Sequence, residues 1–480
     1  MMRVFEFLVA LVIVVAIGVL AAVVMPGSGH VERQLVIGKD MRQVYDMVNN
    51  FRRLPEYSVL RSLDPGVQFE FSGKAYGPGA QVSWTSTDEK LGNGGLTIAS
   101  ATPEFDEIDS NTKEASVVWN LDNNWRGLDK HFTLDLERQG SRGQLTQVTW
   151  AYDVSYGWNL VNRFANLYIH GDPDTFIQFS LNNLQNVLAG VPNIDYSQLI
   201  PYIEQTQPTP VLLVSTSIQR KDGIEAVEEA VTKASGEIQA AAKKLGVNVT
   251  GSRILITTNY GDQNFSFDVA LPIDSSTLTI NDQEEQLTAA TPPSLEQQMA
   301  APAEASSAAG AEGTDVAIGS RDRFGRLIVD DNVRATLAFG GAALQGVWNG
   351  TFAGVPQTRD MLKAYAQTHG YKFDDVVNRS YDIIAQPEET DAEGNITRYA
   401  KYEVFLPVSN APEQTPEQEA GLKQPTLDED EAPAEGSETD PASASSTAPA
   451  ADSSTAEAEP APASSAAAEG DADDEGSAGE

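Results

Sequence analysis

The pattern of hydrophobic and polar positions predicts one long amphipathic helix preceded by a series of strands. Between Asp172 and Gly190, apolar residues recur at steps of three and four. Asp172 is the expected N-cap, Pro173 the first helical residue and Gly190 the stop. The predicted apolar face consists of Ile177, Leu181, Leu184, Leu188 and Val191, widened by Phe176, Phe179 and Val187. Because so wide an apolar face must be buried, we expect this helix to cover a sheet.

The chain from 31 to 156 has the alternation that is typical of strands. A strand at 31–37 and an amphipathic helix after Asp40 precede six further strand candidates, at 67–71, 80–86, 96–101, 116–121, 132–137 and 148–156. Alternate positions gather apolar and aromatic side chains on one face of the sheet. These positions are Val67, Phe69, Phe71, Val82, Trp84, Phe132, Leu134, Leu136, Val148, Trp150, Tyr152, Val154 and Tyr156.

The aromatic residues of this region allow two interpretations. Five of the six tryptophans lie between residues 84 and 158, and each could simply be part of a packed core. Alternatively, a curved sheet around one long helix leaves a cavity, which aromatic side chains with a polar atom would line. On this second interpretation we expect the ligand-binding residues Trp84, Trp119, Trp150, Tyr152 and Phe176.

Three stretches of this region carry a family resemblance: HVERQLVI at 30–37, RQVYDMVNNF at 42–51, and GDPDTF at 171–176 followed by LNNL at 181–184. With them, residues 30–191 resemble the START-related, polyketide-cyclase-like helix-grip superfamily, often called SRPBCC. The resemblance implies a cavity for a lipid-like or aromatic molecule. The aromatic residue that usually follows the first helix pair is here Tyr57, preceded by Leu54, Pro55 and Glu56.

A different order of elements follows the proline-containing linker 192–210. A strand at 211–218, a helix from a capping-box start at Asp222 and Glu225 to Gly246, and strands at 253–258 and 264–273 form one unit. Strand material at 327–339, a helix at 355–369 and strands at 380–385 and 398–408 repeat the order. The repetition predicts a duplicated β-α-β-β domain with pseudo-twofold symmetry.

The second half of this domain carries another resemblance, in RDMLKAY at 359–365, THG at 368–370 and RSY at 379–381. Residues 211–408 resemble GyrI-like or AraC-type effector-binding domains, which implies a small-molecule cleft between the two halves. By motif position Glu403 would face a cationic ligand, with Tyr381 beside it and Asp268 at the matching position of the first half. The alternative for both acids is a solvated position on a strand.

The first 29 residues predict a membrane anchor. Residues 7–25 are apolar or glycine without a charge, and they would span about 28 Å as a helix. A cleaved signal peptide is the alternative. Arg3 and the amino terminus favour a cytoplasmic start, so we expect a single-pass protein of the inner membrane whose soluble part is extracytoplasmic.

The net charge of −37 is concentrated in two segments of low complexity. Residues 411–480 contain 19 acids and one lysine, and residues 281–320 contain seven acids and no basic residue. Rich in Ala, Ser, Pro and Glu, both are predicted to be disordered, the first within a tail at 409–480 and the second as an insertion in the effector-like domain. Because no basic patch interleaved with aromatic residues occurs, nucleic-acid binding is not expected.

Candidate chemistry is sparse. The absence of cysteine excludes disulfides and thiolate catalysis, and the four histidines are too scattered for a local metal site, so no metal or cofactor is expected. We therefore expect an α+β protein, anchored in the membrane, that binds hydrophobic or small amphipathic ligands without catalysis. One alternative is a hydrolase or cyclase that uses the pocket carboxylates of either module. Another is a structural envelope protein with filled cores.

Overall fold

The computed structural model describes residues 2–411 except 89–90, 105–106, 141–142, 198, 200, 262, 292–316, 375 and 392–394. All of these described residues belong to one compact unit of the chain. Its helices and two large antiparallel sheets confirm the predicted α+β class. The predicted tail beyond Ala411 and most of the predicted insertion lie outside the described residues.

The N-terminal helix is α1 (Met2–Val24). Its apolar run Phe5–Val24 is long enough to cross a membrane, and a signal sequence would have the same features. Large apolar side chains remain exposed along this run, including Phe7, Leu11 and Leu20. The helix continues almost directly into the first sheet, because β1 begins at Ser28.

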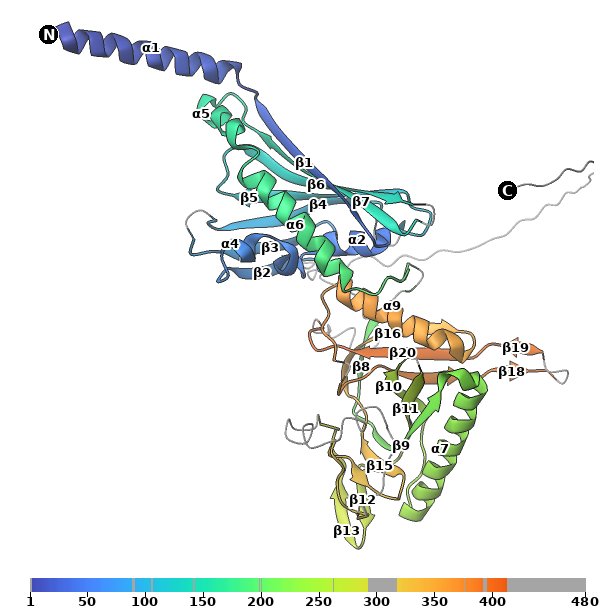
Figure 1. Ribbon diagram of the computed structural model, residues 1–480. Helices are drawn as coiled ribbons and strands as arrows, with labels where there is room; N and C mark the ends of the chain where they lie inside the picture. The colour runs from blue at the N-terminus through green and yellow to red at the C-terminus, as the bar shows by residue number, and fades with distance from the viewer. Residues whose placement is uncertain are drawn as a thin grey trace, which may run out of the picture. The chain divides into compact units, whose positions relative to one another are not determined.

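The first sheet has seven antiparallel strands in the order β1-β7-β6-β5-β4-β3-β2 (Figure 1). Its strands are β1 (Ser28–Ile37), β2 (Gln68–Gly73), β3 (Ala80–Thr85), β4 (Gly94–Thr102), β5 (Glu114–Asn123), β6 (Leu128–Gln139) and β7 (Leu145–Ser155). Most of the predicted apolar positions are buried, but Phe71 is 47% exposed. The prediction for Phe71 was wrong because β2 is an edge strand, so fewer neighbouring residues cover its side chains.

The helices α2 (Met41–Val48), α3 (Leu54–Tyr57) and α4 (Leu60–Leu63) connect β1 to β2. After β7 come α5 (Leu160–Arg163), the 3-10 helix η2 (Phe164–Tyr168) and the long helix α6 (Asp172–Ala189). Helix α6 contacts β1, β7 and α3, so the predicted helix on a sheet is confirmed (Figure 1). Two details differ: the N-cap is Gly171, without a side-chain cap, and Phe179 is 52% exposed.

The second sheet has nine strands in the order β14-β15-β9-β11-β10-β17-β20-β16-β8. They are β8 (Tyr202–Thr206), β9 (Pro210–Gln219), β10 (Ile254–Tyr260), β11 (Asn264–Pro272), β14 (Leu327–Ile328), β15 (Val333–Leu337), β16 (Gly341–Asn349), β17 (Tyr381–Gln386) and β20 (Lys401–Pro407). Two hairpins stand apart from this sheet: β12 (Thr277–Ile280) with β13 (Gln283–Gln286), and β18 (Glu389–Thr390) with β19 (Ile396–Arg398).

Two helices cover one face of the second sheet. Helix α7 (Gly223–Leu245) contacts β9 and β11, and α9 (Val355–Thr368) contacts β16 and β20. A row of directly paired residues, Val214, Val269, Leu255, Asp382 and Val404, lies on this covered face. The alternate residues of the same strands therefore form the opposite face of the sheet.

Four predictions for this region differ in detail from the structure. The strand before α9 is β16, whereas the predicted material at 327–339 forms β14 and β15 beside β9. The predicted linker 192–210 contains the edge strand β8. Asp222 precedes α7 but makes no side-chain cap, and the predicted insertion begins within the turn of the β12-β13 hairpin.

A buried polar cluster joins α2 to the end of α9. The Tyr196 hydroxyl donates to Asp46 Oδ2 at 2.8 Å and lies 2.8 Å from Thr368 Oγ1. Asp46 also accepts from Arg42 Nε at 3.0 Å, and His369 Nε2 lies 4.0 Å away. The surrounding apolar residues form one core that includes members of α2, α6 and α9.

Candidate functional site

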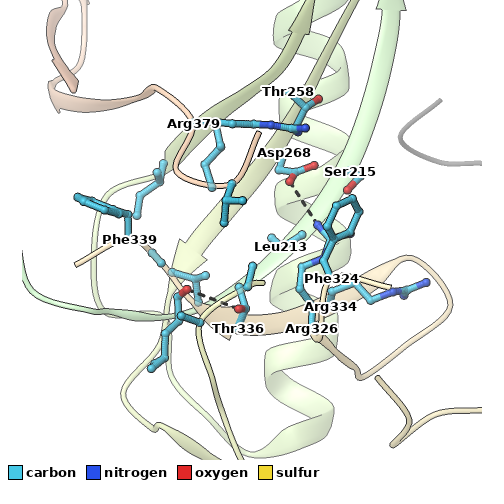
Figure 2. A pocket seen from close by; sticks show the side chains of 18 of the residues that line it. Leu213, Ser215, Thr258, Asp268, Phe324, Arg326, Arg334, Thr336, Phe339 and Arg379 are labelled. Carbon is cyan, nitrogen blue, oxygen red and sulfur yellow. Dashed lines mark hydrogen bonds and ion pairs between the residues drawn. The ribbon is translucent and has the colours of Figure 1, made fainter. Parts of the chain in front are cut away.

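A pocket of about 1300 Å³ lies on the face of the second sheet opposite α7 and α9. Strands β8, β9, β10, β11, β15, β17 and β20 each contribute lining side chains, and the segments 317–326 and 376–379 line it as well. Figure 2 shows these side chains converging from several strands. The pocket is therefore built from residues that are far apart in the sequence.

The floor of the pocket is apolar. Leu213 on β9 and Ile254 on β10 belong to a buried cluster that also includes Tyr381 and Phe405. The rings of Tyr381 and Phe405 stack with centroids 4.8 Å apart and planes 11° apart. Burial raises the pKa of Tyr381 to about 12, and its hydrogen bond with Thr206 opposes this shift. Tyr381 thus presents a neutral aromatic surface to the pocket.

One end of the pocket is formed by an ion-paired cluster. Asp268 on β11 contacts Arg326 Nη1 through Oδ2 at 3.3 Å (Figure 2). Arg326 Nε also donates to Asp322 Oδ2 at 2.7 Å. Asp268 Oδ1 is buried without a hydrogen-bond partner among the described residues. Because a buried carboxylate oxygen needs a donor, this atom is an unsatisfied acceptor in the pocket wall.

A second carboxylate, Glu204 on β8, lines the pocket. Burial raises the pKa of Glu204, and the nearby charge of Glu403 raises it further. Glu403 lies on the same face of the sheet, opposite Ile383 on β17. It is not one of the pocket-lining residues, and it forms an ion pair with Lys401 at 3.7 Å. The prediction that Glu403 binds the ligand stays a prediction.

Arginine side chains line the pocket together with the carboxylates, so the lining carries both positive and negative groups. Arg334 on β15 donates to the backbone oxygens of Asp330 and Asp331, and burial lowers the pKa of its guanidinium. Arg321, Arg323 and Arg379 also line the pocket. An apolar floor beside carboxylates and guanidinium groups suits a ligand that has both an apolar body and polar substituents.

The aromatic residues predicted for the first module lie between its sheet and α6. Trp119 and Trp150 are fully buried and meet edge to face at 5.2 Å. Phe176 from α6 contacts Trp150 at 6.1 Å, edge to face. Tyr152 and Trp84 are also buried, so all five residues belong to the interior of the module. Whether they bind a ligand stays a prediction.

The polar atoms of these aromatic residues are not all satisfied. Trp119 Nε1 donates to the backbone oxygen of Val48 at 3.1 Å. Trp84 Nε1, Trp150 Nε1 and the Tyr57 hydroxyl are buried without a hydrogen-bond partner among the described residues. Burial raises the pKa of Tyr57 far above its usual range, so its hydroxyl keeps its proton. These groups are donors for buried water or a bound guest.

The sequence interpretation missed several pocket residues. Glu204 lies in the segment predicted as a linker, although the alternation of Tyr202, Glu204 and Thr206 is a strand signal. Arg326 carried no local signal, because its partner Asp268 is 58 residues away in the chain. Within the described part of the chain, no group of three His, Cys, Asp or Glu residues is placed to hold a metal ion.

Comparisons with known proteins give structural likeness over part of the chain. No protein-family model matches the chain, and no curated protein matches it. Norcoclaurine synthase from Thalictrum flavum, in complex with dopamine and hydroxybenzaldehyde, is similar over 35% of this chain and 90% of its own, with 11% identity and a TM-score of 0.25. Ara h 8.0201 is similar over 34% of this chain and 99% of its own, with 11% identity and a TM-score of 0.24.

An uncharacterised conserved protein from Listeria innocua is similar over 44% of this chain and 92% of its own, with 16% identity and a TM-score of 0.25. Likeness at these levels assigns no function. The helix-grip description of the first module therefore rests on its own topology, a long helix packed on a seven-stranded antiparallel sheet.

Proposed function

We propose that this protein is a membrane-tethered binding protein for small amphipathic ligands, which occupy the pocket of the second sheet. The observation that carries the proposal is a pocket of about 1300 Å³ with an apolar floor and charged ends. Ligand pockets commonly enclose roughly 300–1000 Å³ and combine apolar walls with a few polar groups. The pocket thus has room for a ligand of drug-like size together with water.

The proposed site lies between two halves of a duplicated domain. Elements β9, α7, β10 and β11 form one half, and β16, α9, β17 and β20 form the other. The halves meet where β10 pairs with β17, and the two halves have mirrored strand orders, β9-β11-β10 and β17-β20-β16. This order supports the pseudo-twofold, GyrI-like arrangement that the sequence resembles.

Within the pocket we assign three binding roles. The stacked rings of Tyr381 and Phe405 hold the apolar or aromatic body of the ligand. Asp268, which lines the pocket beside Arg326, faces a hydrogen-bond donor or a cationic group of the ligand. The arginines of the segment 317–326 face an anionic or carbonyl group. Binding would shift the protein between conformations, without a covalent step.

Two further parts of the proposal concern the first module. Helix α1 serves as the tether, supported by its length and exposed apolar surface. The aromatic interior beneath α6 is proposed as a second site for a hydrophobic guest. Its support is the set of buried indole and phenol groups that have no partner among the described residues.

Native mass spectrometry of the full chain, extracted from membranes in detergent, tests the ligand site. We expect a bound compound of a few hundred daltons that is lost from the variant Leu213→Trp, whose larger ring fills the pocket floor. Leu63→Trp, at an exposed position of α4, is the control and should retain the compound. A compound retained by Leu213→Trp but lost from Trp150→Phe would move the site to the first module. No bound compound in the wild-type protein would contradict both sites.

A further inference from the structure

The connection between β7 and α6 exposes large apolar side chains. Trp158 is 86% exposed and Tyr168 is 74% exposed. None of the residues of α5 and η2 is buried, although this segment includes Leu160, Val161, Phe164 and Leu167. Soluble surfaces rarely gather such side chains unless a partner covers them. We call the exposed set the α5 surface; it consists of Leu128, Trp158, Val161, Leu167 and Tyr168.

The α5 surface lies at the end of the first sheet where the chain passes from α1 into β1. Ser155, the last residue of β7, pairs with Ser28 of β1 and with Leu128 of β6. The backbone nitrogens of Tyr156 and Gly157 donate to the backbone oxygen of Gly27 at 2.8 and 3.2 Å. Three residues separate α1 from β1, so the apolar helix ends within roughly 14 Å of this sheet end.

Arg163 of α5 fixes the end of α1 directly. Its Nη1 donates to the backbone oxygens of Val23 and Met25 at 3.2 and 3.3 Å. Val23 belongs to the last turn of α1, whose backbone oxygens lack intrahelical donors, and Met25 directly follows the helix. The guanidinium of Arg163 also lies 5.1 Å from the ring centre of Trp158. One side chain therefore connects the helix end to the most exposed aromatic residue of the surface.

The surface is held in place by close packing against β1. A Cβ atom at Gly29 would lie 2.9 Å from the Tyr156 hydroxyl, 3.0 Å from Asn166 Oδ1 and 3.0 Å from Ile169 Cδ1. Only glycine allows η2 to approach β1 this closely. The exposed side chains are thus presented from a fixed position relative to the sheet.

Residue types and charge indicate a lipid surface as the occupant. Trp and Tyr are the side chains that favour the boundary between headgroups and acyl chains. The charged residues next to these side chains in the sequence carry both signs: Arg126, Asp129, Lys130, Arg163 and Asp172. Because neither sign dominates, the surface would not depend on anionic lipid.

We propose that the α5 surface rests in the interfacial layer of the bilayer that α1 crosses. This inference depends on the proposed tether. An apolar helix of 20 residues spans about 30 Å, so its C-terminal end reaches the headgroup layer, where Arg163 and Trp158 are held. The first module is thereby fixed against the membrane at one end of its sheet.

The absence of cysteine allows a direct test. Single variants Trp158→Cys and Tyr168→Cys of the full chain are labelled with the fluorophore NBD and reconstituted in phosphatidylcholine vesicles. Leu63→Cys, 53% exposed on α4, is the matched control. We expect doxyl-labelled phosphatidylcholine to reduce NBD emission at least twofold at 158 and 168, with no reduction at 63. High salt should leave this quenching unchanged.

Each other outcome counts against the inference. If the chain floats with the vesicles but lipid quencher leaves positions 158 and 168 unaffected, the surface is not in the bilayer while the tether stands. If the chain does not float at all, the tether itself fails. Equal quenching at all three positions would show unspecific contact. A blue shift without lipid quenching would assign the surface to a second copy or another protein.

Discussion

Trp84 and Gly94 face each other across β3 and β4, and the ring packs directly on the glycine backbone. A Cβ atom at Gly94 would lie 2.3 Å from Cζ2 of Trp84 and 2.9 Å from the backbone oxygen of Asp122. The ring is almost fully buried, so it has little space in which to move. Because Gly94 has no Cβ atom, the ring of Trp84 can occupy this position. Trp84 is one of the residues predicted to bind a ligand.

The variant Gly94→Ala is expected to lose about 2–3 kcal/mol of unfolding free energy, because the added methyl overpacks the core. Urea denaturation of the full chain in detergent measures the change. Gly236→Ala in the middle of α7 is the control, since a Cβ there meets nothing within 4 Å. The control should gain up to about 1 kcal/mol from helix propensity. Equal stability of Gly94→Ala and wild type would contradict the packing argument.

The two acids predicted from the sequence show what a residue pattern can locate. Asp268 and Glu403 each precede a Leu-Pro pair, and both lie on the same face of the second sheet. Alternation along a strand determines the face. It does not determine which residues on that face the segments 317–326 and 376–379 enclose. Asp268 lines the pocket with Arg326, whereas Glu403 is not a lining residue.

At the scale of elements, the start of α6 is fixed by an ion pair. Asp174 in the first turn accepts from Arg33 of β1 through both oxygens, at 2.7 Å each. The hydrogen bonds from Arg33 lower the pKa of Asp174 below its ordinary value of 3.8. This bidentate contact, together with the buried apolar side chains, attaches the helix to the edge strand of the sheet.

The variant Asp174→Asn is expected to lose about 1–2 kcal/mol at pH 7, the range for a charge-assisted bidentate pair with an exposed partner. Because the folded-state pKa is depressed, this stabilisation is present above pH 3.8 and is lost as the pH falls through the lowered value. The difference from wild type should therefore shrink in acid. Asp172→Asn, exposed in the same helical turn, is the control and should change little. A difference that does not shrink as the pH falls below 3.8 would exclude the ion pair as its cause.

Most long elements of this chain could be predicted from periodicity, and two strands of the second large sheet could not. Helices α6, α7 and α9 and most strands follow their hydrophobic pattern. Strand β16 escaped because it is rich in glycine and alanine: a Cβ at Gly346 would lie 3.0 Å from Leu199 Cδ1 and 3.3 Å from Leu362 Cδ2. Close approach of α9 requires small residues, which carry little strand signal. Strand β8 escaped because it is a short edge strand between prolines.

At the scale of the whole molecule, His369 is placed to make stability depend on pH. Burial lowers the pKa of His369 to about 4, while the charge of Asp46 opposes the shift. The unfolded chain, with a histidine pKa of 6.5, binds a proton more readily than the folded one. The contribution of neutral His369 is thus complete above pH 6.5 and is lost as the pH falls towards 4.

We expect the unfolding free energy to fall with decreasing pH by up to about 1.4 kcal/mol per pH unit from this group between pH 6.5 and 4. In the variant His369→Asn this part of the slope should disappear. Chemical denaturation at a series of pH values measures it, with His170→Asn as the control because His170 is exposed. Parallel slopes for His369→Asn and wild type would rule out the buried imidazole as the source.

The polar cluster around Asp46 also limits how such a protein could evolve. Recombination that joined the N-terminal half of this gene to an unrelated C-terminal half would remove Thr368 and His369, which adjoin the buried carboxylate of Asp46. In the hybrid, the Asp46 carboxylate would lose these polar neighbours, and the unrelated half would offer an apolar surface that does not fit around it. The two halves should therefore be inherited together, and natural recombination breakpoints should lie outside the segment that contains both.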